Sequence, residues 1–219
     1  MPLYFIEDEL WFPPVHEALE DGLLAIGGDL STDRLLLAYR SGIFPWFNDD
    51  ELPMWWCPDP RFVLIPEEVK VSKSMKQVMR NGGFELRVDT AFAQVITACQ
   101  QTPRDGQPGT WITEEVKDAY IRLHELGYAH SAEAWKEGTL VGGLYGIRIG
   151  KVFFGESMFS KVSNTSKFAF ISYASRLQTE GVELIDCQVY TSHLESLGAK
   201  MISRESFIML VDRLTSLTA

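Results

Sequence analysis

The chain has 219 residues, of which 46% are hydrophobic and 23% are charged, a composition that excludes a disordered or low-complexity protein. Its formal net charge is −10, which argues against nucleic-acid binding unless basic residues gather locally. The three cysteines are widely spaced and odd in number, which excludes a disulfide framework and favours a reducing compartment. The first residues are not typical of a signal peptide, and apolar runs fall far short of the roughly 20 residues of a membrane span, so we expect a cytoplasmic protein with no membrane partner.

Residues 1–62 are predicted to form a small N-terminal domain. Ser31 is a suitable N-cap for a helix over 32–41, and Gly42 is a suitable residue to follow its C-terminus. Four prolines between residues 45 and 60 exclude a long regular element in the rest of this domain.

The remaining residues, 63–219, alternate strand and helix patterns. The expected elements, in chain order, are a strand at 84–90, helices at 91–100 and 113–126, strands at 129–135, 139–148 and 151–159, a helix at 166–180, a strand at 183–189, a short helix at 192–198 and a helix from about 204. Turn signals between the three central strands predict an antiparallel meander. This order predicts an α+β domain that resembles the acetyltransferase-like fold.

Two polar residues stand in the apolar strand predicted at 183–189. Alternation places Asp186 and Gln188 on one face and Cys187 on the other. A carboxylate and an amide in such a strand are costly unless both are paired. On the pattern alone, a structural polar network is favoured over a functional site by about two to one.

A single acid interrupts the apolar strand predicted at 151–159. Alternation places Glu156 on the same face as Val152, Phe154 and Met158. An exposed glutamate on an edge strand and a functional carboxylate are equally compatible with this pattern.

Apolar residues of the helix at 166–180 follow helical spacing and would pack against the neighbouring strands. Most of this stripe is expected to be core, and one end of it could form a pocket for an apolar side chain. The candidate residues are Leu144, Met158, Phe170, Tyr173, Leu177 and Ile185.

The segment 69–80 contains four basic residues and no acid, although acids outnumber bases by 30 to 20 in the whole chain. If the segment is helical from Ser72, then Lys73, Lys76 and Arg80 form one ridge. A solvated helix face and a phosphate-binding ridge both remain open. No glycine-rich nucleotide motif, HExxH pattern or GxSxG elbow occurs in the sequence, so we expect no cofactor and no metal.

Eleven blocks of the sequence resemble those of the leucyl/phenylalanyl-tRNA–protein transferase family, and they follow the family's order along almost the whole chain. The blocks are GLLAIGGDLS (22–31), GIFPWF (42–47), WWCPDPR (55–61), SKSMK (72–76), GTWIT (109–113), HELGYAHS (124–131), GGLYG (142–146), GESMFS (155–160), SK (166–167), LIDCQV (184–189) and HLESLGA (193–199). The resemblance implies an aminoacyltransferase that moves Leu or Phe, and more weakly Met, from aminoacyl-tRNA to proteins beginning with Arg or Lys. It also implies that the product is marked for degradation through the N-end rule pathway, and that Asp186 and Gln188 are functional after all.

The resemblance also implies roles for individual residues. Asp186 and Gln188 would act at the reacting amine, with Asp186 fixing the Gln188 amide, while Glu156 would help hold the aminoacyl-adenosine end. Trp46 and Trp111 would lie near the terminal adenosine. The six apolar candidates would line the side-chain pocket, and the basic ridge would contact the tRNA acceptor stem.

Two rival functions are consistent with parts of the sequence. An acyl-CoA N-acetyltransferase would place a glycine-rich turn before the helix at 166–180, but the junction here reads SKVSNTSKF and has no glycine. A non-catalytic module that binds tRNA or N-degrons would need neither Glu156 nor Gln188 in a cleft. A monomer is expected.

Overall fold

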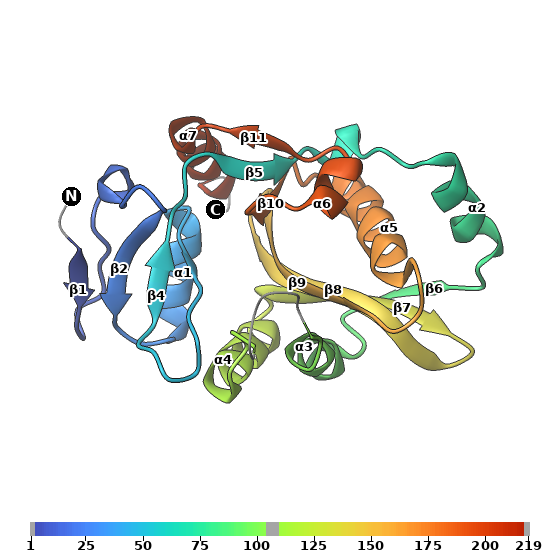
Figure 1. Cartoon of the computed structure of the whole chain (residues 1–219), viewed down its shortest axis with the longest axis horizontal. Coiled ribbons are helices and arrows are strands. Elements are labelled where there is room, and N and C mark those ends of the chain that lie inside the picture. The colour runs from blue at the N-terminus through green and yellow to red at the C-terminus, as the bar shows by residue number, and fades with distance from the viewer. Residues whose placement is uncertain (1–2, 104–109, 217–219) are drawn as a thin grey trace.

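The computed structural model describes residues 3–103 and 110–216, and its mixture of strands and helices confirms the predicted α+β class. A small sheet lies at one end of the molecule beside a larger, curved sheet that carries most of the helices (Figure 1). Within the described residues, no helix has the length and apolar character needed to cross a membrane.

The small sheet has the strand order β1-β2-β4-β3 and packs against one helix. Its elements are β1 (Tyr4–Ile6), β2 (Leu23–Gly27), α1 (Thr32–Arg40), β3 (Phe44–Pro45) and β4 (Met54–Trp56). The predicted helix start is confirmed, because the Ser31 hydroxyl accepts a hydrogen bond from the Arg34 backbone amide. Gly42 follows the helix with a φ of +73°, a conformation that glycine adopts without strain.

The large sheet has the strand order β11-β5-β10-β9-β8-β7-β6. Its strands are β5 (Arg61–Leu64), β6 (Glu85–Val88), β7 (Ala129–Lys136), β8 (Thr139–Ile149), β9 (Val152–Ser160), β10 (Leu184–Gln188) and β11 (Lys200–Ile202). The predicted meander is confirmed as the antiparallel run β7-β8-β9. The sequence pattern missed β5 and β11. The predicted domain boundary at residue 62 falls inside β5, and it stays a prediction.

Helices cover both faces of the large sheet (Figure 1). On one face lie α3 (Phe92–Gln100) and α4 (Glu114–Glu125), and on the other lies α5 (Thr165–Thr179), close to the predicted spans. The remaining helices are α2 (Lys73–Asn81) at the far end, the short α6 (Ser192–Ser196) and α7 (Arg204–Thr215).

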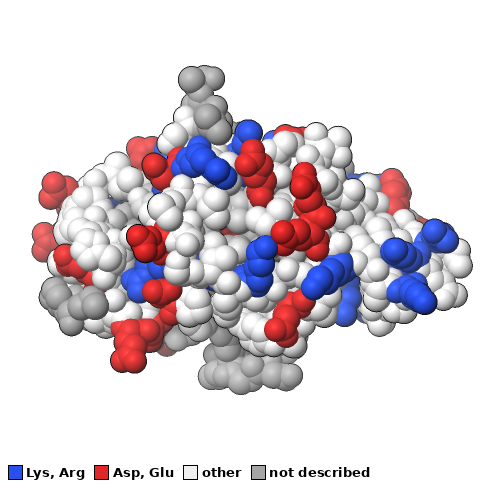
Figure 2. Space-filling view, turned by 90° about the horizontal axis from the view of Figure 1, so that it is seen from above, with Lys and Arg blue, Asp and Glu red and all other residues white. Residues whose placement is uncertain are grey.

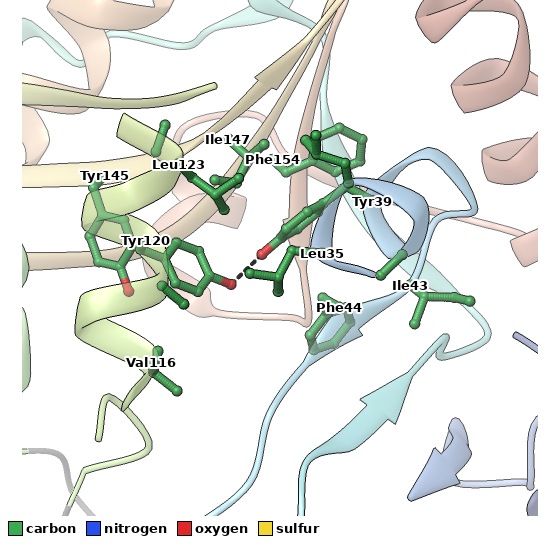
Figure 3. Close-up of a cluster of buried hydrophobic side chains, with 14 of the residues drawn as sticks. Leu35, Tyr39, Ile43, Phe44, Val116, Tyr120, Leu123, Tyr145, Ile147 and Phe154 are labelled. Carbon is green, nitrogen blue, oxygen red and sulfur yellow. Dashed lines mark hydrogen bonds between the residues drawn. The ribbon is translucent and has the colours of Figure 1, made fainter. Parts of the chain in front are cut away.

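One buried core joins the small sheet to the large one. It includes Leu35 and Tyr39 from α1, Tyr120 from α4 and Phe154 from β9. These side chains converge from both parts of the chain, and the rings of Tyr39 and Tyr120 meet in the middle (Figure 3). The N-terminal part therefore packs directly against β9 of the large sheet.

A β-bulge in β9 overturns the predicted alternation of that strand. Ser157 pairs with Tyr145 and Gly155 pairs with Gly146, which leaves Glu156 as the extra residue. An extra residue exchanges the two faces of a strand beyond it. Phe154 and Met158 consequently belong to different core clusters, so the prediction that both share one face with Glu156 is wrong for Met158.

Candidate active site

A cavity of about 680 Å³ opens where β9 and β10 separate. The two strands run parallel and pair only as far as Phe154 and Asp186. Beyond that point, residues 155–158 of β9 line one part of the cavity, and residues 187–189, at the end of β10 and just after it, line another. Residues 44–46 of the N-terminal part also line the cavity. The bulge at Glu156 thus marks the place where the sheet opens.

Asp186 is buried at 0% exposure against a buried arginine that sequence reasoning missed. Arg61 donates from Nε to Oδ1 over 2.9 Å and from Nη2 to Oδ2 over 2.7 Å. Burial alone would lower the pKa of Arg61, but the adjacent carboxylate raises it above its usual value. The pair is a charged, bidentate contact at the wall of the cavity, with both carboxylate oxygens engaged.

Gln188 links the two carboxylates of the site. Its backbone amide donates to Oδ1 of Asp186 over 2.9 Å, and its side-chain Nε2 donates to Oε1 of Glu156 over 2.9 Å. Its φ of +62° lies in the left-handed region, at an irregularity in the pairing of β10 with β5. Asp186 therefore contacts the backbone of Gln188 and not the side-chain amide that we predicted. Cys187, predicted on the opposite face, also lines the cavity because the alternation breaks here.

Glu156 receives three side-chain hydrogen bonds. Tyr39 donates to Oε1 over 2.8 Å and Tyr120 to Oε2 over 3.2 Å, in addition to the bond from Gln188. The two tyrosine hydroxyls also hydrogen-bond each other (Figure 3). Burial raises the pKa of Glu156 to about 7, although the hydrogen bonds from the tyrosines oppose this shift. Glu156 can therefore exchange a proton near neutral pH.

Aromatic residues of the predicted adenosine site lie around the same cavity. Trp111 is 6% exposed in its wall, and Trp46 is 40% exposed and also lines it. Trp46 packs at 5.7 Å between ring centroids against Trp56, whose indole N–H donates to the Trp46 carbonyl. The structure thus brings both predicted tryptophans to one cavity.

Four of the six predicted pocket residues line the cavity, namely Leu144, Met158, Phe170 and Ile185. Tyr173 and Leu177 are buried but are not among its lining residues. Tyr173 packs edge-on against Phe153, which lines the cavity and was not predicted. Apolar residues at helical spacing identify the buried side of α5. This spacing does not distinguish the residues that line the cavity from those buried behind its lining.

Other residues of the site carried weak signals in the sequence. Tyr39 belongs to the buried stripe of α1 and Tyr120 to that of α4, and such a pattern by itself indicates core packing. Cys187 carries a thiol in the cavity wall, but burial and the neighbouring Asp186 raise the pKa of that thiol. A thiol with a raised pKa is a poor nucleophile.

The predicted basic ridge forms on α2, away from the cavity. The Ser72 hydroxyl caps this helix by accepting from the Met75 backbone amide, and Met75 is its buried contact with the core. Lys73, Lys76 and Arg80 are exposed. Figure 2 shows Lys and Arg side chains gathered over this end of the molecule, where Asp and Glu are sparse.

Comparison with known proteins supports one family. A family model described as "Leucyl/phenylalanyl-tRNA protein transferase" matches residues 63–212, and a second, described as the N-terminal domain of that protein, matches residues 28–59. Among solved structures, the chain is similar to one titled "Crystal structure of FemX", with a TM-score of 0.49, 10% identity and coverage of 83% of this chain and 71% of that chain. It is also similar to a GCN5-related N-acetyltransferase-like protein from Streptococcus suis, with a TM-score of 0.37, 9% identity and coverage of 74% and 60%.

Curated relatives match over almost the whole chain. A leucyl/phenylalanyl-tRNA–protein transferase of Flavobacterium johnsoniae is 54% identical over 209 residues, which span 95% of this chain and 99% of the relative. One of the same name from Syntrophus aciditrophicus is 55% identical over 211 residues, spanning 96% and 88%. The chain therefore belongs to the leucyl/phenylalanyl-tRNA–protein transferase family of aminoacyltransferases, as its sequence blocks predicted.

Proposed function

We propose that the cavity accepts the aminoacyl end of Leu-tRNA or Phe-tRNA, and more weakly Met-tRNA, and transfers the amino acid to proteins that begin with Arg or Lys. One observation carries this proposal: a pocket walled by Leu144, Met158 and Phe170 leads to the hydrogen-bonded pair of Gln188 and Glu156. An apolar pocket of this kind suits the side chain of the donor, and convergent polar groups beside it suit the reacting ester.

The transfer is a simple exchange of bonds. The α-amino nitrogen of the acceptor bonds to the ester carbon, the C–O bond to the ribose breaks, and a proton from the amine ends on the ribose oxygen. An α-amino group has a reference pKa of about 7.7–8.0, so a useful fraction is neutral at cellular pH and a strong base is unnecessary. Orientation of the amine can therefore supply much of the rate.

Gln188 is the residue that we propose for orienting the amine. Its Nε2 donates to Glu156, and this hydrogen bond fixes the orientation of the side-chain amide. The carbonyl oxygen of the amide is then an acceptor for an N–H of the incoming amine. Asp186 has both oxygens occupied by Arg61, so we assign it to holding Gln188 and not to taking the proton.

The surface charge supports the choice of acceptor. The chain carries 30 acidic and 20 basic residues, and an acidic surface attracts a protein whose first side chain is a cation. The product would enter the N-end rule degradation pathway of the cytoplasm, and the enzyme would act as a monomer.

The test is transfer of labelled Leu from charged tRNA to a peptide that begins with Arg. We expect transfer by the wild-type chain without added CoA, and a loss on the order of 100-fold for Gln188→Ala, because the amine loses its hydrogen-bond partner. A peptide beginning with Glu is the matched control for the acceptor. Near-normal transfer by both Asp186→Ala and Gln188→Ala would overturn the assignment of these residues.

The α2 ridge is the surface that we propose for the tRNA phosphates. Reversing Lys73, Lys76 and Arg80 to Glu should weaken tRNA binding. The slope of the logarithm of the binding constant against the logarithm of the salt concentration should fall by the equivalent of up to about three phosphate contacts. The matched control makes the same change in net charge at lysines that form ion pairs elsewhere, namely Lys117, Lys151 and Lys200. Equal effects of the two triple variants across a salt titration would remove the ridge from the proposal.

A further inference from the structure

Arg61 is buried beside the cavity but is not among the residues that line it. It is 0% exposed, and its guanidinium lies between two aromatic rings, at 4.6 Å from the centroid of Phe44 and 4.5 Å from that of Phe207. Phe44 comes from β3 of the small sheet and Phe207 from α7 near the C-terminus. Two distant parts of the chain therefore hold the plane of this guanidinium at the start of β5.

The fork of Arg61 fixes the carboxylate of Asp186 in one orientation. Two parallel N–H···O bonds of 2.9 and 2.7 Å determine both the position and the tilt of the carboxylate plane. Oδ1 then accepts the backbone amide of Gln188 over 2.9 Å. A carboxylate that could rotate would not present this oxygen to the amide reliably.

That backbone hydrogen bond stabilises a conformation that Gln188 would not adopt readily by itself. A left-handed φ of +62° is strained for a residue other than glycine. The same conformation turns the Gln188 side chain across the gap between the strands, where Nε2 reaches Glu156 at 2.9 Å. The orientation of the Arg61 guanidinium thereby determines the orientation of the Gln188 side-chain amide beside the cavity.

We propose that Arg61 is a positioning residue for the transfer reaction, which acts through Asp186 to hold Gln188 in the orientation that receives the amine. The inference rests on the proposed function for its kinetic consequence. Its structural content, coupling of Arg61 to the Gln188 backbone, can be measured without any transfer.

The first test is Arg61→Lys, which keeps the positive charge but loses the fork. We expect kcat for Leu transfer to fall by about 10-fold to 100-fold with little change in KM for Leu-tRNA, because misplacing a reacting group slows chemistry more than binding. The matched control is Arg34→Lys. Arg34 is also buried, and it bonds Asp29 and the carbonyls of residues 7–9 outside the cavity. Arg34→Lys should lower the melting temperature and leave kcat unchanged, and the same profile for Arg61→Lys would overturn the proposal.

A double-variant cycle tests whether Arg61 acts through Gln188. Adding Arg61→Lys to Gln188→Ala should cause almost no further loss of kcat, because the group to be positioned is already absent. If the fold-losses of kcat in the two single variants multiply in the double variant, Arg61 does not act through Gln188. If Arg61→Lys does not fold, Phe207→Leu replaces it. That change removes one aromatic face from the guanidinium without touching the cavity lining, and a normal kcat for it would also count against the proposal.

Hydrogen exchange at the Gln188 backbone amide separates this inference from the proposed function. Arg61→Lys should speed exchange of this amide at a temperature where the protein stays folded, and Arg34→Lys should not. Unchanged exchange overturns the coupling even if the wild type is an active transferase. Faster exchange in Arg61→Lys, together with a wild type that transfers no Leu, would leave the coupling intact and reject the proposed function.

Discussion

Two glutamates of the large sheet, one on β7 and one on β9, have surroundings that differ in kind. Glu133 on β7 is 0% exposed and accepts five hydrogen bonds. Two of the donors are the backbone amides of Thr90 and Ala91 at the start of α3, a helix whose N-cap residue has no capping side chain of its own. Glu133 thus supplies, from a neighbouring strand, the negative charge that favours a helix N-terminus.

Glu156 on β9 accepts three hydrogen bonds, all from side chains, and one of its edges faces the cavity. Its burial is less well compensated, and its pKa is raised to about 7. The comparison teaches that a fully satisfied carboxylate marks a structural junction, whereas an incompletely satisfied one beside a cavity is a candidate for a functional group.

The sharpest way to break this comparison is to replace each glutamate by glutamine. Glu156→Gln keeps the shape of the side chain but removes its charge and turns one oxygen into a donor facing a tyrosine hydroxyl. We expect kcat for Leu transfer to fall by about 10-fold to 100-fold, with a melting temperature close to that of the wild type. A kcat equal to that of the wild type would contradict the functional reading of Glu156.

Glu133→Gln should show the opposite profile. At least two of its five donors would then face an NH₂ group, since one oxygen accepts three hydrogen bonds and the other accepts two. The start of α3 would also lose its negative charge. We expect a loss of stability of about 2–3 kcal/mol in denaturant unfolding, with kcat unchanged below the transition. If this variant also lost transfer activity while folded, the distinction between the two glutamates would fail.

The pH dependence of stability should separate the two residues again. The pKa of Glu156 is about 7 in the folded protein against an ordinary value of 4.5, so the folded state binds this proton more tightly than the unfolded state. Its contribution to stability is fully present below pH 4.5 and is lost as the pH rises through about 7, a change of roughly 3 kcal/mol. Unfolding in denaturant across this range should show the slope in the wild type and in Glu133→Gln, but not in Glu156→Gln. A slope that persists in Glu156→Gln would assign it to another group.

The smallest expected effect lies on the apolar side of the cavity, away from both glutamates. Phe170→Ala enlarges the pocket, so the ratio of kcat/KM for Phe over Leu should rise by about 3-fold to 10-fold, since a few methylene groups discriminate only weakly. Leu177→Ala, buried behind the cavity lining, is the matched control. It should lower stability by about 2–5 kcal/mol without changing the ratio. Equal changes in the ratio would place Leu177 in the pocket after all.

Much of the fold followed from local pattern. Capping residues set the start of α1 and α2, and turn signals between apolar runs predicted the β7-β8-β9 meander. The short strands β5 and β11 were missed, because three or four residues after prolines or a short helix carry little periodicity, and pairing in the sheet decides their state.

The sequence by itself determined which residue types we predict for the site, and the structure places Asp186, Gln188, Glu156 and both tryptophans around the same cavity. Only the tertiary structure decided how they connect. The bulge at Glu156 and the left-handed Gln188 break the alternation that strand reasoning assumes, because one extra residue exchanges the faces of everything beyond it. Likewise, the partners Arg61, Tyr39 and Tyr120 are distant in sequence from the carboxylates that they hold, and no local pattern encodes a contact made only when separate elements pack together.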